Sequence, residues 1–105
     1  MRLNDYQEAA RATAIYPKRK GLEYTALGLA GEAGEYANKV KKILRDGAAA
    51  FNQMQLEDEL GDVLWYLAAC ADEIGTPLAL IAQRNLTKLS GRKSAGTLRG
   101  SGDER

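Results

Sequence analysis

Residues 56–74 read LEDELGDVLWYLAACADEI. Apolar side chains recur in this stretch at alternating steps of four and three, at Leu56, Leu60, Val63, Leu67, Cys70 and Ile74. This spacing predicts an α-helix with one apolar seam that packs against other helices. We expect the helix to cover residues 53–74 and to end at Gly75. Asn52 is the expected N-cap, with Gln55 as its capping-box partner.

The helical period returns along most of the chain, and alternating runs typical of strands are almost absent. Three further helices are predicted, over residues 5–15, 22–45 and 76–89. An Asn4–Gln7 capping box is expected to start the first helix, and Tyr16-Pro17 to end it. Asp46-Gly47 is expected to end the second helix, and Thr76-Pro77 to start the last. The predicted fold class is all-α, with a four-helix bundle-like core. Residues 1–92 form the expected domain, and residues 93–105, rich in Gly, Ser and charge, form a flexible tail.

Composition excludes several kinds of chemistry. The chain of 105 residues contains no histidine, which rules out catalytic triads and histidine-bound zinc. Its formal net charge of +1 argues against a general nucleic-acid or membrane-surface binder, because both need a basic excess. Catalysis would therefore depend on carboxylates, lysines, arginines, tyrosines or a metal ion.

The expected location is the cytoplasm. The single cysteine, Cys70, cannot form a disulfide within one chain, which fits a reducing compartment. The first residues, MRLNDYQEAARA, lack the apolar segment of a signal peptide. No apolar stretch is long enough to span a bilayer.

Two predicted helices each carry a pair of carboxylates. GLAGEAGE at residues 28–35 places Glu32 and Glu35 three residues apart, and EDELGD at residues 57–62 places Glu59 and Asp62 three residues apart. Residues so spaced are neighbours on a helix surface, and each pair borders an apolar face. Two helices packed through those faces could bring four carboxylates together.

Carboxylates gathered in this way need a compensating cation. At about 4 Å and an effective dielectric constant near 20, each like-charged pair costs on the order of 4 kcal/mol. An all-oxygen set without histidine or thiolate favours Mg²⁺, with Mn²⁺ possible. The competing interpretation is an ordinary solvated helix face in which Glu35 pairs with Lys39.

The fourth predicted helix carries an amide and two cations on one face, Asn85, Lys88 and Arg92. These groups suit phosphate oxygens. An ordinary polar face, with cations favouring the C-terminal end of the helix dipole, explains them equally well. Aromatic residues that could line a base pocket are Tyr16, Tyr24, Trp65 and Tyr66, although Trp65 also suits a subunit interface.

The stretches GLAGEAGEYANKVKK, ELGDVLWYLA and NLTKLSGR resemble the MazG-like all-α nucleoside triphosphate pyrophosphohydrolases, across residues 3–92. The family pattern is ExxE, a spacer and ExxD. The resemblance implies the four-helix core of this all-α pyrophosphatase type. It also implies hydrolysis of a (deoxy)nucleoside triphosphate to the monophosphate and pyrophosphate, which adjusts or cleans the nucleotide pool.

The resemblance also implies roles for particular residues. Mg²⁺ is held by Glu32, Glu35, Glu59 and Asp62. The phosphates are bound by Lys42, Asn85, Lys88 and Arg92, with Lys39 as a further candidate. Glu35 is our candidate for the general base, although any of the four acids could take the proton of the attacking water. Homodimers or homotetramers with shared sites are expected.

Two alternative functions stay open at this point. The apolar seam of residues 56–74 would also suit a non-catalytic helical dimerisation or interaction module. A phosphoribosyl-ATP-pyrophosphatase-like enzyme would share the acids but not the substrate. A di-iron carboxylate bundle is disfavoured, because its Glu-x-x-His pairs cannot exist in a chain without histidine.

Overall fold

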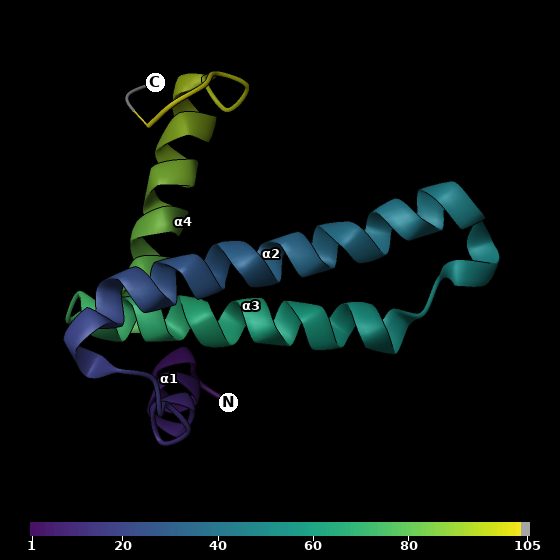
Figure 1. Ribbon diagram of the computed structural model, residues 1–105. Helices are drawn as coiled ribbons and strands as arrows, with labels where there is room; N and C mark the ends of the chain where they lie inside the picture. Colours follow the sequence, from purple (N-terminus) through teal and green to yellow (C-terminus); the bar gives the residue numbers. More distant parts are fainter. Residues whose placement is uncertain (104–105) are drawn as a thin grey trace.

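The secondary structure is entirely helical within residues 1–103, the part of the chain that the computed structural model describes (Figure 1). In chain order the elements are α1 (Leu3–Arg11), the 3₁₀ turn η1 (Lys18–Lys20), α2 (Gly21–Asp46), the 3₁₀ turn η2 (Ala48–Ala50), α3 (Gln53–Glu73) and α4 (Leu78–Ala95). The predicted all-α class with four helices is therefore confirmed.

Helices α2 and α3 form an antiparallel pair and lie side by side along their lengths (Figure 1). Gly47 ends α2 with φ of 86°, a conformation that favours glycine, and its N–H donates to the Ile43 carbonyl at 2.7 Å. Asn52 then caps α3, its side chain accepting from the Gln55 N–H at 3.1 Å. Both predicted helix ends at this hairpin are confirmed.

Helix α1 packs across the C-terminal half of α3 (Figure 1). It ends at Arg11, earlier than predicted, because the chain forms a turn in which the Thr13 N–H and hydroxyl both donate to the Ala10 carbonyl. The predicted capping box at its start is wrong. Arg2 occupies the N-cap position, and Asn4 and Gln7 lie within the helix.

The side chains of Asn4 and Gln7 cap a different helix. Gln7 Oε1 accepts from the Leu78 N–H at 2.8 Å, and Asn4 Oδ1 accepts from the Ala79 N–H at 2.9 Å. These are the first N–H groups of α4, which lack partners within their own helix. Pro77, not the predicted Thr76, takes the N-cap position of α4 and supplies no side-chain bond. Helix α1 therefore holds α4 in place.

Helix α4 turns away from the α2–α3 hairpin. Gly75, with φ of 69°, ends α3, and the chain direction changes by 100° between the two helices (Figure 1). Helix α4 continues to Ala95, beyond the predicted end at residue 89 and into the predicted tail. None of the helices in residues 1–103 is by itself long and apolar enough to cross a membrane; only α3 and α4 counted together, as a bent pair, meet that standard by length and composition.

The core of the single chain is small. Ala68, Ala71 and Leu78 form it, with Tyr6 and Ile81 packed against them. The predicted seam of α3 is only partly covered, since Leu60, Leu67 and Ile74 are exposed. The radius of gyration is 16.5 Å, against about 13 Å for a compact chain of this length. Much of the apolar surface of α2, α3 and α4 thus stays exposed within residues 1–103.

Candidate metal site between helices α2 and α3

Three carboxylates meet where α2 lies alongside the middle of α3. Glu32 comes from α2, and Glu59 and Asp62 come from α3. One oxygen of each lies within 4.8 Å of the others. The pair on α3 converges because its members are three residues apart, and the antiparallel packing brings Glu32 opposite them. We call these residues the carboxylate trio.

Among the described residues, one ion pair, between Lys39 and Glu59, offsets only part of the negative charge of the trio. Partial burial, followed by the negative charges of Asp62, Glu59 and Glu35, raises the pKa of Glu32 above its ordinary value. Lys39 Nζ lies 3.9 Å from Glu59 Oε1, at the outer limit of an ion pair. A hard divalent cation is the group that such an all-oxygen set binds best.

Glu35 stands beside the trio and not within it. Its side chain is exposed, one helical turn after Glu32, and it is close enough for its charge to raise the Glu32 pKa. The structure thus brings three of the four predicted acids to one point and leaves the fourth at the edge. Lys39 lies across the helix pair toward Glu59, and not in the ion pair with Glu35 that the competing interpretation proposed.

Aromatic rings flank the trio on the side toward the start of α2. Tyr66, one turn after Asp62, packs against the backbone of Gly28, which is one turn before Glu32. The Trp65 and Tyr66 rings meet edge to face at 5.0 Å, and Tyr24 lies 6.5 Å from Tyr66. Tyr16 stacks on Tyr24 at 5.2 Å.

These four rings, which we call the aromatic cluster, were each predicted as base-pocket candidates, and the structure gathers them. The pKa of Tyr66 is raised by burial, by its hydrogen bond with Tyr24, and by the nearby charges of Glu32 and Asp62. The Trp65 indole N–H donates to Thr13 Oγ1 at 2.8 Å, so this side chain ties α3 to the turn after α1.

Two lysines flank the trio on the opposite side. Lys39 and Lys42 line a groove of about 190 Å³ with residues from the α2–α3 connection, including Asn52. Along the hairpin the order is therefore aromatic cluster, carboxylates and lysines. Antiparallel packing produces this order, because Tyr66 lies by Gly28, Asp62 influences Glu32, and Glu59 lies by Lys39.

The predicted phosphate ligands on α4 lie elsewhere in the single chain. Lys88 and Arg92 both bind Asp103, from the segment that follows α4. Asn85 lines an apolar groove of about 300 Å³ together with Leu64 and Leu67 of α3. Because α4 turns away from the hairpin, the cations of α4 face residues 97–103 instead of the carboxylate trio.

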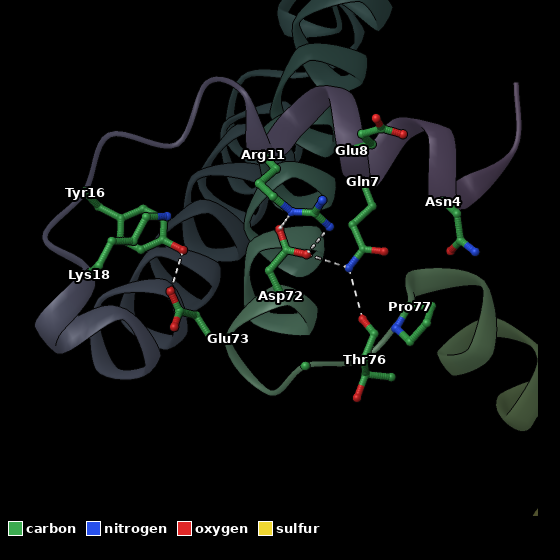
Figure 2. Close-up of a pocket in the computed structure, with 11 residues that line it drawn as sticks. Asn4, Gln7, Glu8, Arg11, Tyr16, Lys18, Asp72, Glu73, Thr76 and Pro77 are labelled. Atoms are coloured by element: carbon green, nitrogen blue, oxygen red, sulfur yellow. Dashed lines mark hydrogen bonds and ion pairs between the residues drawn. The ribbon is translucent and has the colours of Figure 1, made fainter.

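A further cavity, of about 600 Å³, lies between α1 and the α3–α4 turn (Figure 2). Its polar walls are joined by hydrogen bonds. Arg11 binds Asp72 through two nitrogens, at 2.8 and 3.1 Å, and Gln7 donates to Asp72 at 2.9 Å and to the Thr76 carbonyl at 3.0 Å. This polar cluster was not predicted from the sequence. The pattern that could have indicated it is the pair of polar residues Gln7 and Arg11, four residues apart, on the face of α1 that packs against α3.

Tyr16 forms the other end of this cavity. Its hydroxyl donates to Glu73 Oε1 at 2.6 Å, and Lys18 Nζ lies 3.9 Å from the centre of its ring (Figure 2). The pKa of Tyr16 is raised, first by burial and then by its bond to Glu73. These interactions hold the turn after α1 on α3.

Comparison with known proteins identifies a family for this chain. The chain is 49% identical, over an alignment of 114 positions that covers both chains completely, to the Gene 37 protein of Mycobacterium phage L5. No solved structure matches. The model of the MazG nucleotide pyrophosphohydrolase domain matches residues 20–96, from η1 to the end of α4. Because this match covers most of the chain, including all three acids of the trio, the protein belongs to the MazG nucleotide pyrophosphohydrolase family.

Proposed function

We propose that the protein hydrolyses a nucleoside triphosphate, or its deoxy form, to the monophosphate and pyrophosphate, and so adjusts or cleans the nucleotide pool. One observation carries the proposal: three carboxylates from two helices share one point, in a chain of the MazG family. Partial burial and then repulsion from the neighbouring acids raise the pKa of Glu32, which supports a site made for a cation.

The residues present fit Mg²⁺, with Mn²⁺ as an alternative. Glu32, Glu59 and Asp62 would hold the ion, and Glu35 could join them after a change of side-chain rotamer. A bound divalent cation would neutralise phosphate oxygens and acidify a water molecule. The chain has no histidine that could serve as a metal ligand. Its single cysteine, Cys70, lies two helical turns beyond Asp62 on α3 and does not belong to the trio.

The chain's own side chains supply the remaining chemistry. Glu35 is exposed beside the trio, and we assign it as the general base that takes a proton from the attacking water. The water oxygen bonds to the α-phosphorus, the bond from that phosphorus to the bridging oxygen breaks, and pyrophosphate leaves with the electron pair.

The order of groups along the hairpin supports one direction for the substrate. The aromatic cluster would contact the base and sugar, the trio would lie at the α-phosphate, and Lys39 and Lys42 would bind the pyrophosphate portion. A nucleoside triphosphate fits this order, because its base can stack on aromatic rings and its phosphates bind a divalent cation and lysines.

A second copy of the chain would complete the site. Leu27 and Leu44 on α2 and Leu60 and Leu67 on α3 are exposed, and a stable protein buries most such side chains. We therefore propose a homodimer or homotetramer in which Asn85, Lys88 and Arg92 of α4 reach the phosphates of a bound nucleotide. Nucleic acid and membrane are not proposed partners, given the formal net charge of +1.

The first experiment is a product assay. Purified protein is incubated with each common dNTP and NTP and with phosphoribosyl-ATP, with Mg²⁺ or with EDTA, and the products are separated by anion exchange. We expect a monophosphate and pyrophosphate only with Mg²⁺, and loss of turnover in Asp62→Asn. The exposed Asp58→Asn, on the same helix, is the matched control and should retain turnover. A diphosphate with orthophosphate would refute the assigned bond.

The exposed apolar surface supports one other candidate function, a non-catalytic helical interaction module. Melting measured with and without Mg²⁺ separates the two. An interaction module would melt at the same temperature in both conditions, and its Asp62→Asn variant would be neutral or more stable. A rise in melting temperature with Mg²⁺ would count against the module, because a bound ligand stabilises the folded state by mass action.

A further inference from the structure

Two cations of α4 are joined to a carboxylate that follows the helix. Lys88 Nζ lies 2.9 Å from Asp103 Oδ1, and Arg92 Nη2 lies 3.0 Å from the same oxygen. Arg92 Nη2 also donates to the Gly102 carbonyl at 3.2 Å. Lys88 and Arg92 are one helical turn apart, so they present their donors to a single point. One oxyanion is therefore bound by two cations at once.

The chain returns to these cations through defined turns. Gly96 ends α4 with φ of 73°, while the Thr97 N–H donates to the Arg92 carbonyl and the Gly96 N–H donates to the Lys93 carbonyl. This pair of bonds is a Schellman motif, which reverses the chain after a helix. Gly102, with φ of 78°, makes a further bend just before Asp103. Figure 1 shows the segment curling over the end of α4.

The two partners of this interaction differ in their exposure. The Arg92 side chain is 7% exposed, whereas the Asp103 side chain is 79% exposed. The guanidinium is thus largely buried, and the carboxylate is open to solvent. The pKa of Asp103 is lowered, first by its hydrogen bond with Lys88 and then by that with Arg92, so it is ionised at neutral pH.

An exposed carboxylate held by two cations can be replaced by another anion, because both Asp103 and Lys88 are open to solvent. Exposed ion pairs contribute little net stability, because water screens them and side-chain entropy opposes them. A phosphate group carries more charge than a carboxylate and has three terminal oxygens, so it makes stronger charge-assisted bonds to lysine and arginine. The same two cations should therefore exchange Asp103 for a phosphate.

We propose that Lys88 and Arg92 form an oxyanion site that Asp103 occupies in the free protein, and that a phosphate of the nucleotide substrate displaces Asp103. Residues 97–103 then act as an autoinhibitory segment that lowers substrate affinity. The kinetic part of this inference rests on the proposed function. The competition itself rests only on the contacts among Lys88, Arg92 and Asp103.

A binding experiment tests the competition without turnover. Tripolyphosphate is titrated by calorimetry, without divalent metal, into the full chain and into Asp103→Asn. We expect the variant to bind roughly fivefold more tightly, the value of one modest exposed ion pair. Adding Lys88→Gln to both proteins should reduce the difference between them. Asp5→Asn, an exposed acid on α1, is the charge-matched control and should bind like the unaltered chain.

Unchanged or weaker binding by Asp103→Asn would overturn the inference, and so would a complete lack of tripolyphosphate binding. Steady-state kinetics with Mg²⁺ adds an independent readout, in which the variant should lower KM by a similar factor at constant kcat. Tighter tripolyphosphate binding without turnover of any nucleotide would refute the proposed function and leave the oxyanion site standing. Metal-dependent turnover with no effect of Asp103→Asn would do the reverse.

Discussion

The phenol ring of Tyr66 occupies the space in which Gly28 would carry a Cβ atom. Gly28 is one turn from Glu32 on α2, and Tyr66 is one turn from Asp62 on α3, so this contact sets the distance between the helices next to the carboxylate trio. Glycine costs about 1 kcal/mol relative to alanine inside a helix. At position 28 the lack of a Cβ atom is what allows the Tyr66 ring to approach the α2 backbone so closely.

Gly28→Ala is therefore expected to displace the Tyr66 ring and to lower turnover several-fold. The gain in helix propensity, about 1 kcal/mol, should be offset by an overpacking cost of about 1–3 kcal/mol. Gly31→Ala is the control, because nothing lies within 4 Å of the added carbon in the single chain. Urea unfolding should show Gly31→Ala more stable than the unaltered protein by about 0.5–1 kcal/mol. Equal effects of both changes would contradict the assigned role of Gly28.

Partial burial of Glu32, together with repulsion from the neighbouring acids, predicts a pH dependence of stability in the absence of metal. The pKa of Glu32 lies above its ordinary value of 4.5 in the folded protein. The folded state therefore holds this proton more tightly than the unfolded state, and stability should fall as the pH rises from about 4.5 through the raised pKa. Glu32→Gln should flatten this slope in urea unfolding with EDTA. The exposed Glu8→Gln, on α1, should keep it.

Metal binding should raise the melting temperature, and the acids should differ in how much each contributes to this rise. At a Mg²⁺ concentration one hundred times its Kd, the stabilisation is about 2.7 kcal/mol. Asp62→Asn removes a member of the trio and should abolish most of this effect. Glu35→Gln, outside the trio, should retain a larger part of it while losing turnover. Equal loss of metal-dependent melting in both variants would instead make Glu35 a full ligand.

The lysine groove predicts an effect on substrate binding. Lys42→Gln should raise KM about five- to tenfold with a smaller change in kcat, because a phosphate loses one charge-assisted bond. Lys41→Gln is the matched control, since Lys41 is the exposed neighbour on α2 and adjacent helical residues point in different directions. Steady-state kinetics on the preferred nucleotide measures both. A similar KM for the two variants would exclude Lys42 from the phosphate subsite.

The contacts between α1 and α4 predict a large loss of stability at one polar residue. Gln7 is 4% exposed, and its amide joins Asp72, the Thr76 carbonyl and the Leu78 N–H. Gln7→Ala removes the partner of the Thr76 carbonyl and of the Leu78 N–H, while Asp72 keeps Arg11, and should cost about 2–3 kcal/mol in urea unfolding. Asn4→Ala removes one cap and should cost about 1 kcal/mol. The exposed Gln83→Ala should change stability by less than about 0.5 kcal/mol.

The amino-acid sequence by itself determined the helices and several of their ends. The period of residues 56–74, Gly47 at the end of α2, the Asn52 cap and Gly75 after α3 all depend on residues within one or two helical turns. Such local preferences act whatever the rest of the chain does. The pairing of acids on each helix is equally local, because residues three apart lie on one face.

Only the tertiary structure decided how those faces are used. It placed Glu32 opposite Glu59 and Asp62 and left Glu35 at the edge, because the register of α2 on α3 depends on packing such as that of Tyr66 on Gly28. It also turned Gln7 from an expected cap of its own helix into the cap of α4, 71 residues away. Bonds between residues so far apart in the chain form only once the helices meet, so no local pattern could assign them.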